Sequence, residues 1–152
     1  MLAAMIATVV LVMACVLIHY EILRLTSDFM PRLSVPPRPR MLVVIGAAFL
    51  AHTIEVWVFA VAYYGLQDHL GFGSVEGASG IVDLVYFSAE TYTSLGFGDV
   101  YPLGGLRLVA GVEALLGLLM IGWSGSFTYL EMQRYWKLHG EGSKGAGPDK
   151  KR

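Results

Sequence analysis

Long apolar runs alternate with short polar segments along the chain, and three of these runs have the length of a membrane span. Residues 1–20 are almost wholly apolar, and residues 41–65 and 104–132 are apolar with few interruptions. A helix of about 20 residues is about 30 Å long, which is enough to cross the hydrocarbon core of a bilayer. The pattern therefore predicts three transmembrane helices.

A fourth apolar segment, residues 81–92, is only about half as long as a span requires. It follows a Gly-rich loop over residues 66–80, and it leads into the hydroxyl and glycine residues of positions 93–99. Non-helical backbone inside a membrane is tolerated only where it is buried in protein or lines a watery path. We therefore expect a re-entrant helix at 81–92 and a loop of functional backbone at 93–99.

The composition also indicates a membrane protein. Of the 152 residues 55% are hydrophobic, and the mean hydropathy of +0.58 is too high for an ordinary soluble domain. The single Cys15 rules out an internal disulfide. The chain has no Arg-rich voltage-sensing helix and no nucleotide or calcium motif. We expect no cofactor other than permeant ions, no small-molecule substrate and no nucleic-acid partner.

The distribution of positive charge predicts the orientation of the spans. Arg107 lies near one end of the predicted spans, whereas the other ten Lys and Arg residues lie in 21–40 or beyond residue 133. By the positive-inside rule the N-terminus lies outside and the C-terminus is cytoplasmic. Residues 21–40 are then a cytoplasmic linker, in which Pro36–Pro39 is not expected to be helical. The Gly- and Lys-rich residues 136–152 are expected to form a disordered tail.

The loop after the re-entrant helix carries the most specific motif. Its sequence is Thr93-Ser94-Leu95-Gly96-Phe97-Gly98-Asp99. It resembles the selectivity filter of the potassium channels, in which four copies of the loop direct carbonyl oxygens at a common axis and replace the hydration shell of the ion. The resemblance implies an all-α tetrameric pore with an ion-binding filter at 93–98. It places the K⁺ ligands on Ser94, Leu95, Gly96 and Phe97.

Residues that flank the filter motif extend the resemblance. Tyr86 and Phe87 match an aromatic pair that braces the filter in this family. Glu90 and Asp99 match positions where several bacterial channels place two carboxyl groups behind the filter, one of which would hold its proton above its normal pKa. A second Gly-Phe-Gly at 71–73 lacks all these flanking residues, so we do not assign it to a filter.

The resemblance assigns residues 41–135 to a pore domain. The domain consists of an outer helix (41–65), a turret (66–80), a pore helix (81–92), a filter (93–99) and an inner helix (104–132). The helix at 1–20 is additional to this pattern, and we place it at the periphery. Glycines of the inner helix act as gating hinges in the family, which makes Gly117 and Gly122 candidates; close helix packing is the alternative explanation.

Three ionisable residues interrupt the predicted spans, namely His52, Glu55 and Glu113. Acids inside a membrane are costly and usually face the protein interior. His52 and Glu55 share a helix face, and the rise of the two helices puts Glu55 and Glu113 at a similar depth. Our hypothesis is a buried polar layer behind the pore whose protonation biases gating. The alternative is a fixed structural network.

The sequence thus predicts a potassium-selective, homotetrameric channel subunit in the lipid of a bacterial inner membrane, and not an enzyme. A regulatory partner and a non-conducting accessory role stay open. Leu95 and Phe97 replace the commoner Val and Tyr, so a weakly selective cation channel is one alternative, and without the Tyr hydroxyl we expect a filter that inactivates more readily. The other alternative is a membrane-embedded metalloenzyme using His52 and Glu55, although a catalytic zinc usually takes three protein ligands.

Overall fold

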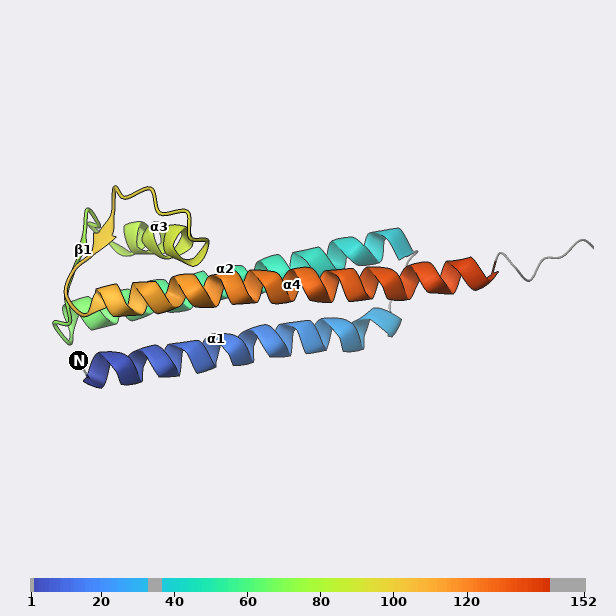
Figure 1. Ribbon diagram of the computed structural model, residues 1–152, viewed down its shortest axis with the longest axis horizontal. Coiled ribbons are helices and arrows are strands. Elements are labelled where there is room, and N and C mark those ends of the chain that lie inside the picture. The colour runs from blue at the N-terminus through green and yellow to red at the C-terminus, as the bar shows by residue number, and fades with distance from the viewer. Residues whose placement is uncertain (1, 33–36, 143–152) are drawn as a thin grey trace, which may run out of the picture.

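The computed structural model describes residues 2–32 and 37–142 of the chain. Within these residues three helices are long and apolar enough to cross a membrane: α1 (Leu2–Phe29), α2 (Pro37–Asp68) and α4 (Leu106–Gly142). They run alternately up and down, and the short helix α3 (Ile81–Tyr92) lies between α2 and α4 in the sequence (Figure 1). The predicted class, an all-α membrane protein with a short helix between its second and third spans, is confirmed.

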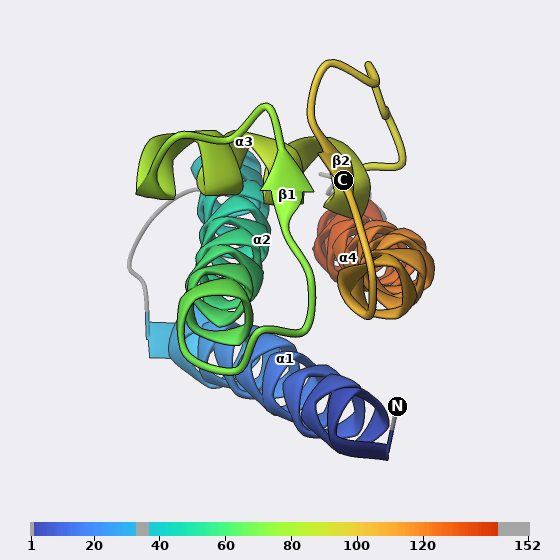
Figure 2. The same cartoon turned by 90° about the vertical axis from the view of Figure 1, so that its left-hand side faces the viewer.

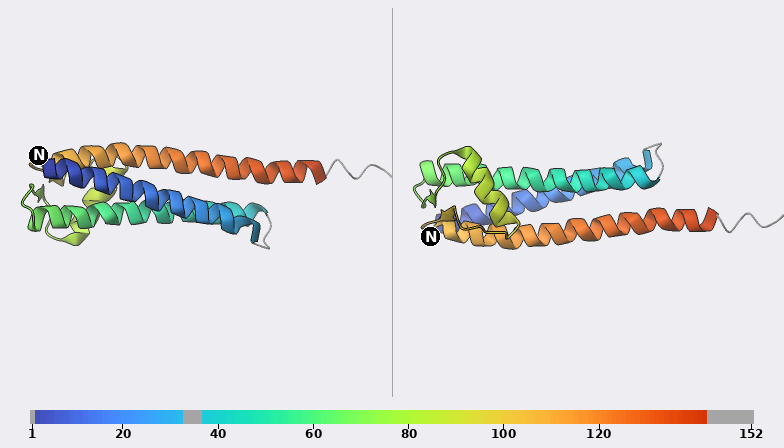
Figure 3. Two further views of the ribbon diagram at one scale, coloured as in Figure 1. Left: turned by 90° about the horizontal axis from the view of Figure 1, so that it is seen from below. Right: turned by 90° about the horizontal axis from the view of Figure 1, so that it is seen from above.

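The helices α2 and α4 form a central pair that the other two helices cover from opposite sides. Figures 1 and 2 show α1 on one side of this pair and α3 on the other. From above, α3 crosses the pair obliquely at the end of the molecule where the N-terminus lies (Figure 3). Each of α1 and α3 contacts both α2 and α4. The loop that follows α3 therefore lies on the face remote from α1.

The first helix is longer than the predicted span of residues 1–20. Its buried stripe continues beyond Tyr20 at the helical spacing of His19, Leu23 and Thr26, and Met30 extends it into a 3₁₀ turn at Met30–Arg32. The opposite face exposes large apolar side chains suited to lipid. The prediction of a linker over residues 21–40 was therefore wrong for most of its length, because packing against α2 and α4 keeps this segment helical.

The second helix begins at Pro37, within the segment that we expected to be non-helical. Residues 33–36 lie outside the described part of the chain. Pro37 and Pro39 fall in the first turn of α2, where backbone N–H groups have no acceptor inside the helix. The missing N–H of proline therefore costs no intrahelical hydrogen bond there, and the prediction was wrong for residues 37–39.

The pore helix α3 has the predicted bounds, and its N-terminus is fixed by a carboxylate. Asp83 Oδ2 accepts hydrogen bonds from the Ser79 backbone N–H (2.7 Å) and the Ser79 hydroxyl (2.6 Å). The hydroxyl and backbone donors of Ser79 hold the pKa of Asp83 below its ordinary value. An acid in the first turn also interacts favourably with the positive end of the helix dipole. The loop entering α3 is thereby tied to its first turn.

The second Gly-Phe-Gly, at 71–73, has a structural role in the turret. The Phe72 carbonyl accepts a hydrogen bond from Gly105 N–H (2.6 Å), and the Ser74 carbonyl accepts one from Leu103 N–H (2.8 Å). A Cβ atom at Gly73 would lie 2.0 Å from the carbonyl oxygen of Leu103. Next to these contacts a two-residue strand β1 (Val75–Glu76) pairs antiparallel with β2 (Tyr101–Pro102), which the sequence did not predict. This turret segment therefore holds the chain that leaves the filter loop.

The last helix extends past the predicted end of the inner helix at residue 132. It continues to Gly142, so the predicted tail at 136–152 is helical in its first seven residues. This extension contains no proline, and half of its residues are good helix formers, namely Gln133, Arg134, Lys137, Leu138 and Glu141. The expected disorder of residues 143–152 falls outside the described residues.

The two hinge candidates on α4 have different surroundings. A Cβ atom at Gly117 would lie 1.9 Å from the carbonyl oxygen of Tyr92, at the end of α3. At Gly122 a Cβ atom would meet nothing within 4 Å. Close approach of α4 to the pore helix therefore accounts for Gly117. A hinge at either glycine stays a prediction.

We predict that Gly117→Ala destabilises the protein by roughly 1–3 kcal/mol, because the added methyl group forces α4 away from a backbone carbonyl that cannot rotate aside. Gly122→Ala is the matched control in the same helix; it fills open space and gains up to about 1 kcal/mol of helix propensity. Thermal unfolding in detergent compares the two variants with the parent chain. Equal unfolding temperatures for the two variants would contradict the packing explanation.

Candidate functional site

The filter loop is anchored to the last turn of α3 by its own backbone. The N–H groups of Leu95 and Gly96 donate to the Glu90 carbonyl oxygen at 2.8 and 3.3 Å. The Ser94 N–H donates to the Thr91 carbonyl at 2.9 Å. These bonds satisfy carbonyl groups that the end of a helix would otherwise leave without partners. The start of the loop therefore has a position set by the pore helix.

The backbone of the loop alternates between two conformations. Ser94, Gly96 and Gly98 have positive φ values of 58°, 54° and 83°, whereas Leu95 and Phe97 between them do not. Such alternation lets successive carbonyl groups face the same way, and glycine reaches positive φ without strain. The two glycines were expected to do this. Ser94 was not, because a positive φ is uncommon for a residue with a side chain.

Two of the predicted supporting residues, Tyr86 and Glu90, contact the loop, and Tyr86 bonds the third, Asp99, at the end of the loop. The Tyr86 ring stacks beside Phe97, with centroids 6.5 Å apart and planes 4° from parallel, and the Tyr86 hydroxyl donates to Asp99 Oδ1 at 3.2 Å. Glu90 Oε2 accepts a hydrogen bond from the Phe97 backbone N–H at 3.1 Å. Side chains of the pore helix therefore hold both the middle and the end of the filter loop.

Two details of the predicted support need correction. Phe87 is buried against α2, where its ring lies 5.0 Å from that of Tyr63, and it anchors the pore helix rather than the filter. Neighbouring residues of a helix point about 100° apart, so Tyr86 and Phe87 cannot both face the loop. Glu90 and Asp99 also take separate hydrogen-bond donors, so their geometry gives no shared proton.

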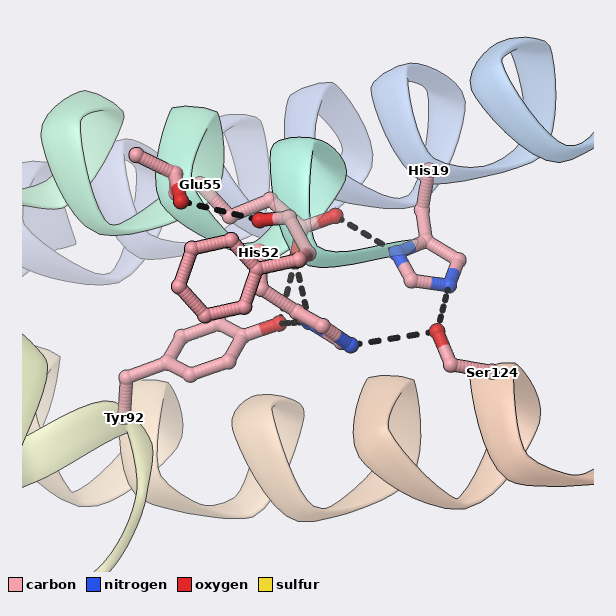
Figure 4. Close-up of polar contacts among 7 residues, drawn as sticks. His19, His52, Glu55, Tyr92 and Ser124 are labelled. Carbon is pink, nitrogen blue, oxygen red and sulfur yellow. Dashed lines mark hydrogen bonds and ion pairs between the residues drawn. The ribbon is translucent and has the colours of Figure 1, made fainter. Parts of the chain in front are cut away.

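A group of five polar side chains joins all four helices in the middle of the protein, and we call it the midspan network. Its members are His19, His52, Glu55, Tyr92 and Ser124 (Figure 4). His19 Nδ1 lies 2.9 Å from Glu55 Oε1, and the Tyr92 hydroxyl donates to Glu55 Oε2. His52 Nδ1 lies 2.9 Å from the Tyr92 hydroxyl. The Nε2 atoms of both histidines lie 3.1 Å from Ser124 Oγ.

The hydrogen count of the midspan network requires one proton beyond those of an ionised Glu55 and two neutral imidazoles. Its five contacts each need one hydrogen between two electronegative atoms. With Glu55 ionised and both imidazoles neutral, the imidazoles and the hydroxyl groups of Tyr92 and Ser124 supply four. One further proton completes the set and makes the network electrically neutral. Either the Glu55 carboxyl group or one of the two imidazoles can carry this proton and complete the five contacts.

The network is sealed from solvent on most sides. His19 and Glu55 are fully buried, and both lie close to the midpoints of their apolar spans, Met5–Arg32 and Pro39–Asp68. The His52 side chain is 20% exposed and borders a cavity of about 380 Å³. Apolar side chains of α2, α3 and α4 line that cavity together with Tyr92 and Thr93, the first filter residue. The midspan network thus has one opening, next to the filter loop, among the described residues.

A second buried carboxyl group, Glu113, belongs to a separate cluster. The Tyr63 hydroxyl lies 2.5 Å from Glu113 Oε2, and Ser88 Oγ lies 2.5 Å from Oε1. Ser88 Oγ is also 2.9 Å from the Val56 carbonyl oxygen. The serine has a single hydroxyl hydrogen for these two acceptors. Both contacts are satisfied when Glu113 carries a proton and donates it to Ser88.

The hypothesis of one polar layer over His52, Glu55 and Glu113 was therefore incomplete. The first two share the midspan network, whereas Glu113 forms its own cluster about three helical turns before Ser124 on α4. Sequence reasoning missed His19, which falls at the end of the predicted first span rather than inside it. It also missed Tyr92 and Ser124. With His19 the site has three candidate metal ligands, whose donor atoms lie within 4.8 Å of one another, rather than the two expected.

Comparison with known proteins identifies the family. A family model described as an ion channel matches residues 42–130, which is more than half of the chain. The chain belongs to this ion channel family. The recognition of the pore-domain family is thus confirmed, and the match indicates a channel rather than an enzyme. The matched range covers most of α2, all of α3, the loop at 93–99 and most of α4, and it leaves α1 outside.

One similar protein is Protein LctB of Geobacillus stearothermophilus, which is 40% identical over 70 residues. The alignment covers 41% of this chain and 52% of that protein, so the chain spans about half the length of this relative. No solved structure matches the chain.

We predict that Glu113→Leu destabilises the protein by about 1–3 kcal/mol, because the buried hydroxyl groups of Tyr63 and Ser88 lose a partner. Glu113→Gln is the matched control, since its amide can donate to Ser88 and accept from Tyr63. Thermal unfolding in detergent measures both variants. A Gln variant as unstable as the Leu variant would show that Glu113 acts as a carboxylate rather than as a protonated acid.

Proposed function

We propose that the protein is a potassium-selective channel subunit whose filter is built from four copies of the loop at 93–98. The observation that carries this proposal is the alternating backbone of Ser94, Leu95, Gly96, Phe97 and Gly98 within a motif that resembles a potassium filter. Potassium is coordinated by carbonyl oxygens that replace its hydration shell, and conduction proceeds by knock-on between adjacent sites. No chemical bond is made or broken.

The exposed filter loop supports a homotetramer. In a single chain Leu95 and Phe97 are 59% and 67% exposed, although both are large apolar residues. One loop cannot surround an ion, and closed rotational symmetry is the usual solution for identical subunits. The loop lies on the face of the α2–α4 pair remote from α1 (Figure 2). A central axis next to the loop therefore places α1 at the periphery, in contact with lipid.

The chemistry of the supports fits the role of a filter. Glu90 fixes the Phe97 peptide group through a charge-assisted hydrogen bond, and Tyr86 holds Asp99 at the end of the loop. A filter must keep its carbonyl groups in place while ions enter and leave. The carbonyl oxygens of Ser94, Leu95, Gly96 and Phe97, with the hydroxyl of Ser94, are the proposed ligands.

The orientation in the membrane follows from the charges. The N-terminus of α1 and the filter loop lie at one end of the molecule (Figure 1). Arg24, Arg32 and Arg134 belong to the segments that approach the other end, and the positive-inside rule makes that end cytoplasmic. We propose an N-terminus outside and a C-terminus inside a bacterial inner membrane.

A liposome flux assay tests the proposed function directly. Purified protein is reconstituted, and flux is measured under a potassium gradient, then under a sodium gradient, and with barium as a blocker. We expect barium-sensitive potassium flux and little sodium flux. Gly96→Ala should abolish potassium selectivity or flux, because alanine is strained at a φ of 54°. Gly46→Ala, whose Cβ meets nothing within 4 Å, is the control and should conduct normally.

Equal potassium and sodium flux would contradict the proposed selectivity and leave a general cation pore on the same scaffold. Absence of flux under both ions would contradict the proposal of a pore that conducts by itself. The oligomeric state is measured in the same preparation by mass photometry, and a monomer or dimer would contradict the tetramer.

The Phe97 position yields a separate prediction. Phe97 lacks the hydroxyl of the commoner Tyr, so this part of the filter is held by the Glu90 carboxylate and by stacking on Tyr86. We expect Phe97→Tyr to slow the decay of current in patch recordings, because the added hydroxyl gives the filter a further hydrogen bond. Tyr64→Phe, whose ring packs edge-on against His69 at the end of α2, is a control for the exchange of a Tyr and a Phe. An unchanged decay of current in Phe97→Tyr would contradict the link between the missing hydroxyl and the inactivation of the filter.

A further inference from the structure

We infer that the midspan network is a binding site for one divalent first-row metal ion, with Zn²⁺ the best match, held by His19, His52 and Glu55. This site does not depend on the selectivity of the filter. It joins α1, which the family match leaves outside, to α2 within the pore domain.

The donor set favours zinc. Two imidazoles and one carboxylate are the protein ligands of a well-known class of three-ligand zinc sites, in which a fourth position stays open. Imidazole nitrogen suits zinc and copper, whereas sites for magnesium and calcium are built from oxygen. Cys15 is also buried in this region, but its thiol is not among the donor atoms that come together. We therefore expect a shell of nitrogen and oxygen without sulfur.

The distances require little movement to hold a metal. Zinc bonds of about 2.0–2.2 Å in a tetrahedron put neighbouring ligand atoms roughly 3.3–3.5 Å apart. His52 Nδ1 already lies 3.5 Å from Glu55 Oε2, and His19 Nδ1 lies 2.9 Å from Oε1. All three residues have donor atoms within 4.8 Å of one another. Rotation of the two rings and the carboxylate is enough to close the site.

Ser124 supplies the outer contact that metal-bound histidines usually have. A histidine that ligates a metal through one nitrogen donates its other N–H to an acceptor, and this fixes the tautomer. The Nε2 atoms of His19 and His52 both lie 3.1 Å from Ser124 Oγ (Figure 4), whose two lone pairs can accept from both. Both Nδ1 atoms are then free of hydrogen and lie on the side of Glu55.

The charge of the site also suits a cation. An ionised carboxylate beside two neutral imidazoles is the ligand form that a metal needs, and a divalent cation offsets its negative charge. Any proton that the three ligands share is released when the metal binds. The Tyr92 hydroxyl stays as a hydrogen-bond donor to the carboxylate. The ion would enter through the cavity that borders His52 and Thr93.

Metal binding would have two structural consequences. It would fasten α1 to α2 near the middle of both spans, where bilayer lipid competes for the same helix faces. It would also fix the position of Glu55, which accepts the hydrogen bond of the Tyr92 hydroxyl. Tyr92 directly precedes Thr93, and its carbonyl oxygen lies against α4 at Gly117. The site is therefore in a position to stabilise the fold around the start of the filter.

Calorimetric titration tests the site on the full-length protein. The protein is purified in detergent, stripped with a chelator and titrated with Zn²⁺, and bound metal is counted by mass spectrometry after gel filtration. We expect one tightly bound Zn²⁺ per chain and a higher unfolding temperature with zinc than without. Potassium and magnesium ions at the same concentration should leave the unfolding temperature unchanged.

Matched histidine variants locate the ion. His19→Asn keeps a hydrogen-bond donor near the Glu55 carboxylate but removes a ligand, and we expect it to weaken zinc binding by at least about 100-fold. His69→Asn, which changes an exposed histidine after α2, should leave binding unchanged. Ser124→Ala should weaken binding about 10–100-fold through loss of the outer contact. Circular dichroism and gel filtration verify that each variant is folded.

X-ray absorption on the zinc-loaded parent chain tests the ligands without any variant. Two imidazoles and further oxygen or nitrogen atoms, with no sulfur, are expected around the metal. Absence of zinc binding by the parent chain would overturn the inference. Sulfur in the shell, or affinity lost in His69→Asn and kept in His19→Asn, would place the metal elsewhere and overturn it as well.

Discussion

The burial of the Glu55 carboxylate in the middle of a membrane span is the constraint on which most of the structure depends. A charge at that depth is costly unless partners satisfy it. No single neighbouring helix meets the requirement. His19 comes from α1, Tyr92 from the end of α3, and His52 from the preceding turn of α2, while Ser124 of α4 joins the two histidines. Satisfying one carboxylate therefore determines how four helices lie together.

The same constraint extends to the filter loop. Tyr92 is the last residue of α3, and its side chain is held by Glu55 while its carbonyl oxygen is approached by α4 at Gly117. One residue further the chain enters a backbone with alternating φ, including the unfavourable positive value at Ser94. Strained backbone of this kind persists only where its surroundings determine it. The midspan network at one end and Glu90, Tyr86 and the turret at the other provide those surroundings.

The local features of the pore could be predicted from the sequence, whereas the contacts between helices could not. The bounds of α3 and the filter motif are encoded in consecutive residues, so the pattern at 81–99 was enough. His19 was missed for a physical reason: with the first span ended at Tyr20, it lay at a membrane boundary where a histidine needs no partner. The helix continues to Phe29, which moves His19 to mid-span. Its contact with Ser124 joins residues 105 positions apart, and no local pattern reports that distance.

The two acids are both fully buried, but equal burial does not imply equal chemistry. Glu113 is surrounded by hydroxyl groups of Tyr63 and Ser88, and its contacts are satisfied by a neutral carboxylic acid. Glu55 lies against two imidazoles, and the contacts there need one proton that the carboxyl group and the imidazoles can share. The difference arises from α1, because only the midspan network includes a residue of that helix. Without His19, Glu55 would have partners only from the pore domain, and one of its two oxygens would lose its contact. The additional helix therefore completes the hydrogen bonding of the Glu55 carboxyl group, because His19 supplies the contact of Oε1 that the residues of the matched domain do not.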